Sequence, residues 1–447
     1  MIIKTIATIS TPTGSGAISI VRMSGDKALR IASRMFSTKK LESFSDAQAN
    51  YLYLGTVTTD TVQDKALAVV FRAPSSYTGE DVVEFQCHGG VRLAQEILRG
   101  CIALGAQPAT KGEFTRRAFV NGKLALSDCE GIIDMINGES ISAINAGYRL
   151  SQGGIATTLT AMQARMLDVM TDMEASLDYP LEMEDESKIN CRQVLGELLV
   201  DLREFVASAS VGKYIKGGIA VAIVGQANVG KSSLLNALLG KNRAIVTDIA
   251  GTTRDTLEEM IEVNGVALKL IDTAGIRNTG DAIEAIGVER SLESMRNADI
   301  TLFVTEAGRG LNTEEKALLD TIEKNGGRYI KVYNKCELGV ADGNDDGILI
   351  SVYRKHNLDL LTKTIVQMFV DKNIDSSAQI ITSERHVYVL NKAIASLENV
   401  LATLDDYPTE CLLIDMRQGY FALGEITGNT ANELIIDNIF NKFCLGK

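Results

Sequence analysis

The sequence predicts a multidomain α/β protein in which an α/β domain is inserted into a discontinuous helical domain, preceded by an α+β domain. Three changes in hydrophobic periodicity indicate this division. Strand-like runs with glycine turns fill residues 1–120, and a helical period covers residues 121–216. Short apolar runs separated by helical segments follow over 217–377, and the helical period returns over 378–447. The two helical stretches therefore flank the α/β region.

Composition narrows the classes of protein to which the chain can belong. A chain of 447 residues with 45% hydrophobic content is long enough for several cores. The net charge of −12 disfavours a generally basic nucleic-acid coat but leaves a local RNA-binding patch open. Seven cysteines without a C-x-x-C pair predict a reducing compartment. No apolar run approaches the ~18 residues of a membrane span, so we expect a soluble, cytoplasmic protein.

The region of residues 1–120 has the pattern of an α+β domain. Its strand-like runs are ISIVRMSG, YLYLGTV, KALAVVFRAP and EDVVEFQCHGG. One helical run, RLAQEILRGCIALGA, interrupts the strands. Strands that pair around a few helices are typical of this fold class.

The first helical stretch carries an apolar stripe at helical spacing. Its members recur every three or four residues and are Ile155, Leu159, Met162, Met166, Val169, Met173 and Leu177. We expect this stripe to be a core seam of one long helix. The run DYPLEMEDE (178–186) then contains Pro180 and several carboxylates, which predicts a solvated connector, with a cation site as the alternative. The polar run KNIDSSAQ (372–379) is the predicted exit linker from the α/β domain.

The α/β domain is predicted from five short apolar runs. They are IAVAIVG, ALKLIDTAG, DITLFVTE, RYIKVYNK and GILISV, and helical segments separate them, as in a parallel sheet. The pair Asn264-Gly265 predicts a hairpin between the second of these runs and the strand-like segment before it.

The run GQANVGKS (225–232) matches the phosphate-binding motif G-x-x-x-x-G-K-S and lies between a strand and a helix-forming segment. Glycines let backbone N–H groups surround the phosphates, and the helix N-terminus faces their negative charge. Lys231 is placed to reach the β- and γ-phosphates and Ser232 to ligate magnesium. A purely structural glycine turn does not explain the Lys-Ser pair, so the motif predicts a P-loop.

Further motifs follow in the order expected of a Ras-like GTPase. GTTRD (251–255) supplies switch hydroxyls, of which Thr253 completes the magnesium shell, and Asp272 of DTAG holds magnesium through water. NKCE (334–337) and SVY (351–353) are predicted to bind the guanine base. The residues that we predict to bind GTP are Asn228, Val229, Gly230, Lys231, Ser232, Ser233, Thr247, Asp248, Ile249, Ala250, Gly251, Thr252, Thr253, Asp272, Thr273, Ala274, Gly275, Asn334, Lys335, Glu337, Ser351 and Val352.

Two positions depart from the usual GTPase pattern. Glu337 stands where aspartate is usual, and its longer side chain must bend to accept two N–H bonds from guanine. ATP is the alternative ligand, and a competition titration in which ATP displaced GDP as well as GTP does would favour it. Ile276 stands where Ras-type enzymes place a water-orienting glutamine, so hydrolysis must recruit another residue. Glu284 and Glu289 are the carboxylate candidates.

The motifs together resemble the MnmE (TrmE) family of tRNA modification GTPases over essentially the whole chain. The stretches that carry the resemblance are GSGAISIVRMSG, APSSYTGEDVVEFQCHGG, KGEFTRRAFVNGKLALSDCEGIIDMI, GQANVGKSSLLNALLG, TDIAGTTRD, DTAGIR and FNKFCLGK. The resemblance implies an N-terminal homodimerising domain that binds 5-formyl- or methylene-tetrahydrofolate. It also implies an FAD-dependent partner, MnmG, that forms a heterotetramer with this chain and alone binds FAD.

The family's activity is the addition of a carboxymethylaminomethyl or aminomethyl group to C5 of the wobble uridine of certain tRNAs. Its GTP hydrolysis is driven by K⁺-dependent dimerisation of the G domains. By resemblance, Asn228 binds K⁺ together with Thr247, Ile249 and Thr252, where the cation takes the place of an arginine finger. Glu284 matches the family's water-orienting glutamate.

The folate contacts implied by the resemblance are Arg22, Glu84, Lys123 and Lys447. A carboxylate suits the pterin edge, and Arg or Lys suits the glutamate tail. Without the family match, Arg22, Glu84 and Lys123 would be interpreted as surface charges. His88 is equally well explained as a structural histidine beside a turn.

The tail FCLGK has the outline of a C-a-a-X lipidation box, but Gly446 and Lys447 are atypical and no polybasic run precedes it. An amphipathic helix, ANELIIDNIFNKF, is expected to lay the tail against the helical body. Cys444 is a candidate nucleophile, with a spectator thiol as the equal alternative. A regulatory or ribosome-assembly GTPase is the alternative function, although it does not account for EDVVEFQCHGG or CLGK.

Overall fold

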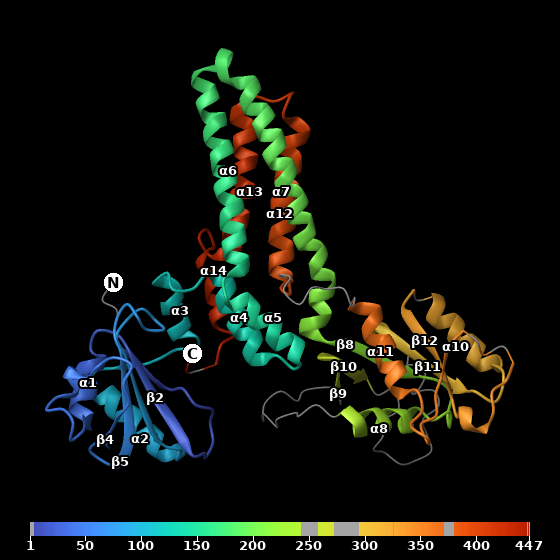
Figure 1. The fold of residues 1–447 in the computed structure, drawn as a ribbon, viewed down its shortest axis with the longest axis horizontal. Helices are drawn as coiled ribbons and strands as arrows, with labels where there is room; N and C mark the ends of the chain where they lie inside the picture. Colours follow the sequence, from blue (N-terminus) through green and yellow to red (C-terminus); the bar gives the residue numbers. More distant parts are fainter. Residues whose placement is uncertain are drawn as a thin grey trace. The chain divides into compact units, whose positions relative to one another are not determined.

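The computed structural model describes residues 4–242, 258–271, 295–324, 326–342, 344, 346–370, 380–444 and 446. Contacts divide the chain into two compact units. The first contains Met1–Ile133, Arg149–Leu199 and Lys392–Lys447, and the second contains Asp134–Tyr148 and Val200–Asn391. Two helices, α7 (Pro180–Gly217) and α12 (Glu384–Thr403), run through the boundaries between the units (Figure 1).

The N-terminal part of the first unit is built on a sheet of seven described strands in the order β3-β4-β5-β6-β2-β1-β7, blue in Figure 1. The strands are β1 (Ile6–Ile9), β2 (Ile18–Ser24), β3 (Phe36–Ser37), β4 (Tyr53–Thr58), β5 (Gln63–Phe71), β6 (Val82–His88) and β7 (Gln107–Pro108). The accompanying helices are α1 (Ala28–Met35), the short 3₁₀ helix η1 (Phe44–Asp46) and α2 (Val91–Ala103). This arrangement confirms the predicted α+β domain.

Alternation along β6 separates the core face of this sheet from its polar face. Phe85 and Cys87 are buried in a cluster with Ile31 of α1 and Ile97 of α2. Side chains two residues apart on a strand share a face, so Glu84 lies on the opposite face. The antiparallel register of β2 and β6 places Arg22 directly across from Glu84. The strand pattern alone therefore brings two predicted site residues together.

The helical part of the chain contains the apolar seam predicted from its spacing. Its helices are α3 (Glu113–Val120), α4 (Leu126–Asn137), α5 (Ile141–Ser151), α6 (Gly154–Asp178), α7, α12, α13 (Thr409–Thr427) and α14 (Glu433–Phe440). The stripe on α6 is buried from Ile155 to Met173, whereas Leu177 is 40% exposed.

Helices α6 and α13 lie side by side although they are far apart in the sequence. Gln163 Nε2 on α6 donates a hydrogen bond to the Tyr420 carbonyl on α13 at 2.9 Å. Met166 packs beside Gly419, where an added Cβ would lie 3.4 Å from the methionine methyl carbon. The two halves of the helical domain thus share one core, which confirms that it is discontinuous in sequence.

The predicted connector at residues 178–186 is wrong. Only the step from Asp178 to Pro180 is non-helical, and α7 begins at Pro180 itself. Proline is tolerated at the first helical position because its missing N–H has no intrahelical partner there. The acidic residues that follow lie on the helix, where Glu184 pairs with Lys188 at 2.8 Å. Within the described residues, no group of three or more His, Cys, Asp or Glu side chains is placed to hold a metal ion.

The second unit contains a sheet whose described strands have the order β13-β12-β11-β8-β10-β9. The strands are β8 (Ile219–Val224), β9 (Glu258–Val263), β10 (Val266–Ile271), β11 (Ile300–Glu306), β12 (Arg328–Asn334) and β13 (Ile348–Leu349). Its helices are α8 (Lys231–Asn242), α10 (Thr313–Lys324), η2 (Cys336–Leu338) and α11 (Leu358–Phe369). All neighbouring strands are parallel except β9 and β10. This is the α/β domain that the sequence predicts.

The hairpin of β9 and β10 turns at Asn264 and Gly265, as predicted. Their φ values are +52° and +83°, and Val263 pairs with Val266 across the turn. Two consecutive residues with positive φ are the mark of a type I′ turn, which Asn-Gly adopts readily. The predicted exit linker at 372–379 lies outside the described residues. Among those residues, no helix has the length and apolar character needed to cross a membrane.

We predict that Met166→Ala destabilises the helical domain. Met166 of α6 is completely buried and packs beside Gly419 of α13, so truncation leaves a cavity and lowers the free energy of unfolding by about 2–5 kcal/mol. Leu177→Ala on the same helix is the matched control, with an expected change of less than about 0.5 kcal/mol because Leu177 is partly exposed. Denaturant unfolding followed by circular dichroism checks both values. Equal destabilisation by Met166→Ala and Leu177→Ala would contradict the inference that the apolar stripe of α6 forms the core of the helical domain.

Candidate functional site

Three parallel strands of the second unit end at one edge of the sheet. β8 leads into the P-loop, and β11 and β12 end at Glu306 and Asn334. Ligands of α/β sheets bind beyond the carboxyl ends of the strands, because loops from neighbouring strands meet there. This edge is therefore the candidate functional site.

Glycines give the P-loop its close approach to the neighbouring strands. Gly225 has φ +153°, and an added Cβ would lie 2.2 Å from the Val304 carbonyl of β11. Gly230 has φ +100°, and an added Cβ would lie 2.3 Å from Asn334 Nδ2. Both distances are shorter than any real carbon contact, so only glycine fits at these two positions. The consequence is a backbone that can fold around an anion.

The functional side chains of the P-loop lie at the N-terminus of α8. Lys231 Nζ donates to the carbonyls of Gly225 and Gln226, both at 2.7 Å. Ser232 and Ser233 are exposed in the first turn of the helix. The first N–H groups of a helix lack intrahelical partners, and together with the lysine ammonium they favour a phosphate.

Hydrogen bonds connect the predicted base-recognition motif to the P-loop. Asn334 is 3% exposed, and its Nδ2 donates to the Val229 carbonyl at 2.9 Å. Lys335 Nζ donates to the Asn228 carbonyl at 2.9 Å. The Val352 N–H, predicted to face guanine, donates to Asn334 Oδ1 at 3.3 Å. The residues predicted to bind phosphate and those predicted to bind the base thus share one hydrogen-bonded frame.

Glu337 presents an acceptor at this edge. Its Oε2 atom is buried and has no hydrogen-bond partner in the described part of the structure. A hydrogen bond from the Ser351 side chain holds the pKa of the Glu337 carboxyl below its usual value, so the group stays ionised. The N–H groups of a guanine edge are the kind of donor that such an oxygen accepts.

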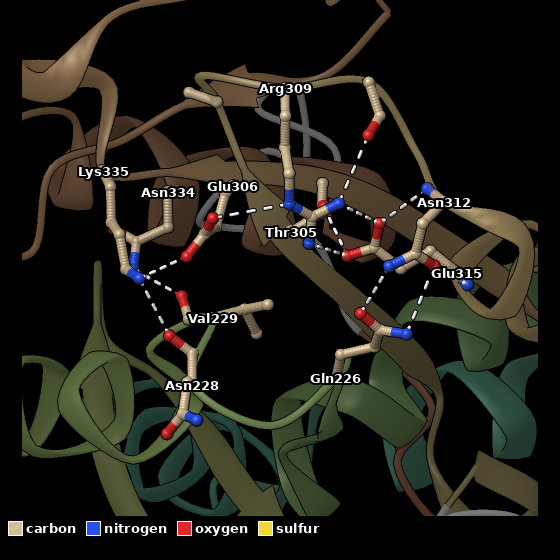
Figure 2. Close-up of polar contacts among 12 residues, drawn as sticks. Gln226, Asn228, Val229, Thr305, Glu306, Arg309, Asn312, Glu315, Asn334 and Lys335 are labelled. Atoms are coloured by element: carbon tan, nitrogen blue, oxygen red, sulfur yellow. Dashed lines mark hydrogen bonds and ion pairs between the residues drawn. The ribbon is translucent and has the colours of Figure 1, made fainter.

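A further set of polar contacts lies at this edge of the sheet, and Figure 2 shows it. Apart from one capping box, local sequence patterns do not indicate these contacts. We call this set the polar ring because its hydrogen bonds and ion pairs begin at Gln226 of the P-loop and end at Asn228 and Val229 of the same loop. Its members are Gln226, Asn312, Glu315, Thr305, Arg309, Glu306, Lys335, Asn334, Asn228 and Val229. The Asn312-x-x-Glu315 capping box was the one sequence signal for it, because such a pair marks the start of a helix.

The centre of the polar ring is a charged cluster. Glu315 is fully buried and receives both terminal nitrogens of Arg309, at 2.6 and 2.8 Å. Glu306 lies between Arg309, at 3.4 Å, and the Lys335 ammonium. Hydrogen bonding to Lys335 lowers the pKa of Glu306, which keeps it ionised at neutral pH.

Part of the predicted nucleotide site falls outside the segments that the structure describes. These residues are Thr247, Asp248, Ile249, Ala250, Gly251, Thr252, Thr253, Asp272, Thr273, Ala274, Gly275 and Glu284, and Lys447 is the corresponding member of the folate set. The described members, from Asn228 to Ser233 and from Asn334 to Val352, are brought to one edge of the sheet.

The predicted folate residues lie in the first unit. Arg22 Nε donates to Glu84 Oε1 at 2.7 Å, and the guanidinium lies 5.7 Å from the centre of the Phe114 ring on α3. Lys123 is exposed, and its Nζ donates to the Pro74 carbonyl at 3.1 Å. Arg22 and Glu84 are thus paired with each other, and a bound ligand must share or replace that ion pair.

The C-terminal tail is anchored on both sides of Cys444. Phe443 is buried beside Phe440 in a cluster with Leu126 of α4, as expected for an amphipathic helix that packs on the helical body. Gly446 has φ +110°, and an added Cβ would lie 2.9 Å from the Ile9 carbonyl at the end of β1. Cys444 itself is exposed.

Comparisons with known proteins cover nearly the whole chain. The family model described as GTP-binding protein TrmE N-terminus matches residues 5–123, and the model described as MnmE helical domain matches residues 126–444. The tRNA modification GTPase MnmE of Lactobacillus gasseri is 40% identical over 454 residues, covering 99% of this chain and 98% of the relative. The protein of the same name from Streptococcus thermophilus is 40% identical over 453 residues, with the same coverage.

We predict that Gly230→Ala breaks the frame between the P-loop and Asn334. The added methyl group occupies the position of the Asn334 amide, and the positive φ adds strain of about 1–3 kcal/mol. The melting temperature falls and binding of a fluorescent GDP analogue is lost.

Gly240→Ala is the matched control, because Gly240 lies inside α8 with open space around its Cα. This change should be neutral or stabilise the helix by about 0.5–1 kcal/mol. Retention of GDP binding by Gly230→Ala would refute the close packing inferred for the P-loop.

Proposed function

Because the chain belongs to the MnmE family of tRNA modification GTPases, we propose that it hydrolyses GTP to support the modification of tRNA. The observation that carries this proposal is the frame in which Asn334 and Lys335 are hydrogen-bonded to the P-loop. It unites a phosphate-binding loop with a base-recognition motif at one sheet edge. The full-length match to relatives of that name supplies the tRNA part of the proposal.

Guanine is the base that this edge favours. The unpartnered Oε2 atom of Glu337 calls for an N–H donor, and guanine presents two adjacent donors on its pyrimidine edge. Adenine presents a ring nitrogen acceptor at the corresponding place, which a carboxylate repels. Glutamate at position 337, in place of the usual aspartate, is therefore compatible with GTP. The Ser351 side chain donates a hydrogen bond to Glu337, and the Val352 N–H donates one to Asn334 Oδ1.

The P-loop and the motifs GTTRD and DTAG are the proposed binding segments for the phosphates and the cations. Lys231 and the N–H groups from Asn228 to Ser233 bind the phosphates, and Ser232 and Thr253 ligate Mg²⁺. The remaining nucleotide contacts are Thr247, Asp248, Ile249, Ala250, Gly251, Thr252, Asp272, Thr273, Ala274 and Gly275. A bound Mg²⁺ supplies positive charge that stabilises the phosphoryl oxygens during hydrolysis. The exposed Ser232 hydroxyl at the start of α8 suits this role.

K⁺ is the proposed activator of hydrolysis. Asn228 binds it together with Thr247, Ile249 and Thr252, and the cation stabilises transition-state charge where other GTPases use an arginine. The left-handed conformation of Asn228, with φ +64°, and the fixing of its carbonyl by Lys335 support a preorganised ligand. Glu284 orients the attacking water, since Ile276 cannot accept or donate a hydrogen bond.

The N-terminal domain is proposed to bind 5-formyl- or methylene-tetrahydrofolate and to form the homodimer. Arg22, Glu84, Lys123 and Lys447 are the assigned contacts. The partly buried Arg22–Glu84 pair supports this proposal, because it offers a carboxylate and a guanidinium together beside an aromatic ring. The anchoring of the tail near β1 supports the inclusion of Lys447 as a contact and of Cys444 as the nucleophile.

The modification is proposed to be the carboxymethylaminomethyl or aminomethyl group at C5 of the wobble uridine. An MnmG-like partner carries the FAD, and a heterotetramer in the cytoplasm is the working assembly. The net charge of −12 implies that much of the tRNA surface comes from the partner. The domains of this proposal are residues 1–120, 121–216, 217–377 and 378–447.

We predict that K⁺ stimulates GTP hydrolysis by at least about tenfold over Na⁺, because the K⁺ site completes the charge stabilisation of the transition state. In Glu284→Ala, turnover in K⁺ falls about 100-fold while GDP binding is retained, since the side chain acts on water and not on the nucleotide. Steady-state phosphate release and fluorescent GDP titration measure the two quantities.

Glu289→Ala, at the second carboxylate candidate in the same sequence segment, is the matched control and should retain K⁺-stimulated turnover. Equal rates in K⁺ and Na⁺ would contradict the cation site. Full turnover in Glu284→Ala would instead reject that residue as the water-orienting group.

We predict that deletion of the gene removes the modified wobble uridine from tRNA and that the wild-type chain restores it. In Cys444→Ser the modification is lost if the thiol is the nucleophile, because a hydroxyl is far less nucleophilic at neutral pH. Mass spectrometry of tRNA nucleosides measures both effects. Cys411→Ser, at another exposed cysteine, is the control.

Unchanged nucleosides in the deletion strain would favour the alternative function, a regulatory or ribosome-assembly GTPase. Full modification by Cys444→Ser would remove the thiol from the mechanism and leave the rest of the proposal intact.

A further inference from the structure

Glu306 occupies a position in the polar ring to which the proposed function gives no role. It is the last residue of β11, and β12 lies beside it with Asn334 as its register partner. Its carboxylate contacts two cations, the Lys335 ammonium and the Arg309 guanidinium. Both Glu306 and Lys335 have side chains that are 32% exposed, so the pair lies at the rim of the site.

Lys335 connects Glu306 to the P-loop. Its ammonium donates to the Asn228 carbonyl at 2.9 Å as well as to Glu306 (Figure 2). A lysine side chain has several rotatable bonds, so two fixed acceptors are what define its position. Without Glu306, the ammonium would keep only one of the two acceptors that define its position, the Asn228 carbonyl.

The position of Glu306 is itself fixed from the other side. Arg309 holds it at 3.4 Å and is bound by both oxygens of the fully buried Glu315. Glu315 also accepts the Asn312 N–H at 3.0 Å and the Thr305 hydroxyl at 2.8 Å, which ties it to the start of α10 and to β11. A bidentate arginine with buried partners is a rigid support.

The P-loop is held at its first part by the same network. Asn312 Nδ2 donates to Gln226 Oε1 at 2.7 Å, and Gln226 Nε2 donates back to Asn312 Oδ1 at 3.2 Å. The polar ring therefore holds the P-loop at Gln226 and at Asn228, on either side of Ala227. A change at one side of the ring is transmitted through side chains that each have a defined partner.

We propose that Glu306 is a positioning residue that couples guanine binding by Lys335 to K⁺ binding by Asn228 of the P-loop. It holds Lys335 on the Asn228 carbonyl, so that placing the lysine along the base and fixing Asn228 are a single event. This inference rests on the proposed function, because it takes Lys335 as a guanine contact and Asn228 as the K⁺ ligand.

The affinity for GDP separates positioning from a simple effect of charge. Removing a negative charge near the site should, by electrostatics alone, strengthen the binding of an anionic nucleotide. Positioning predicts the opposite, because a released Lys335 no longer packs where the base binds. For K⁺, a looser Asn228 and a lost negative charge both weaken binding.

The test uses Glu306→Gln and Glu306→Asp in the full-length chain. We measure the Kd of a fluorescent GDP analogue and the K⁺ concentration that gives half-maximal hydrolysis at saturating GTP. Glu306→Gln should weaken GDP binding about tenfold and raise the half-maximal K⁺ concentration about threefold or more. Glu306→Asp keeps the charge with a shorter reach and should recover part of both effects.

Asp346→Asn is the matched control, since Asp346 pairs with Lys331 on β12 at 2.6 Å and lies outside the polar ring. It should leave both values unchanged. Unchanged or tighter GDP binding in Glu306→Gln would overturn the proposal, and so would an unchanged K⁺ response. If the wild-type chain itself neither bound GDP nor responded to K⁺, the proposed function would fail first, which keeps the two failures distinct.

Discussion

The hydrogen bond from Asn334 to the Val229 carbonyl is the constraint on which the nucleotide edge depends. It is buried and 2.9 Å long, and it joins the end of β12 to the P-loop that follows β8. Because β11 lies between these two strands, the bond spans the sheet edge and sets how closely the two loops approach. Gly230 must lack a side chain for this approach to occur. A buried polar group without its partner costs about 1–3 kcal/mol, so breaking this contact is unfavourable.

A second constraint acts in the helical domain, where packing and not hydrogen bonding joins distant parts of the chain. The seam of α6 packs against α13, and these helices lie on opposite sides of the inserted α/β domain in the sequence. The insertion is tolerated because its two ends leave from α7 and return before α12, so neither interrupts the seam. The core of the α/β domain is a separate apolar cluster that includes the fully buried Val221 and Leu302.

Features set by local spacing could be predicted from the sequence, and features set by tertiary contact could not. The turn at Asn264-Gly265 and the burial of Met166 follow from rules that act within a few residues. The connector predicted around Pro180 is wrong because proline can follow the end of one helix or begin the next, and the two cases have the same local pattern. The Glu306–Lys335 contact joins residues 29 apart, and it exists only because β11 and β12 are neighbours in the sheet.

The tail shows how packing can change the interpretation of a short motif. Phe443 is buried in the helical cluster and Gly446 is buried against Ile9, so the exposed Cys444 is held between two fixed points. β1 pairs with β2, and the register places Thr8 beside Arg22. The strand that contacts the tail therefore adjoins β2, which carries Arg22, and the partner of Arg22, Glu84, lies on β6. The proposed function assigns Cys444 to the same site as that pair, and anchoring on both sides of the thiol lowers the entropy that such a contact would cost.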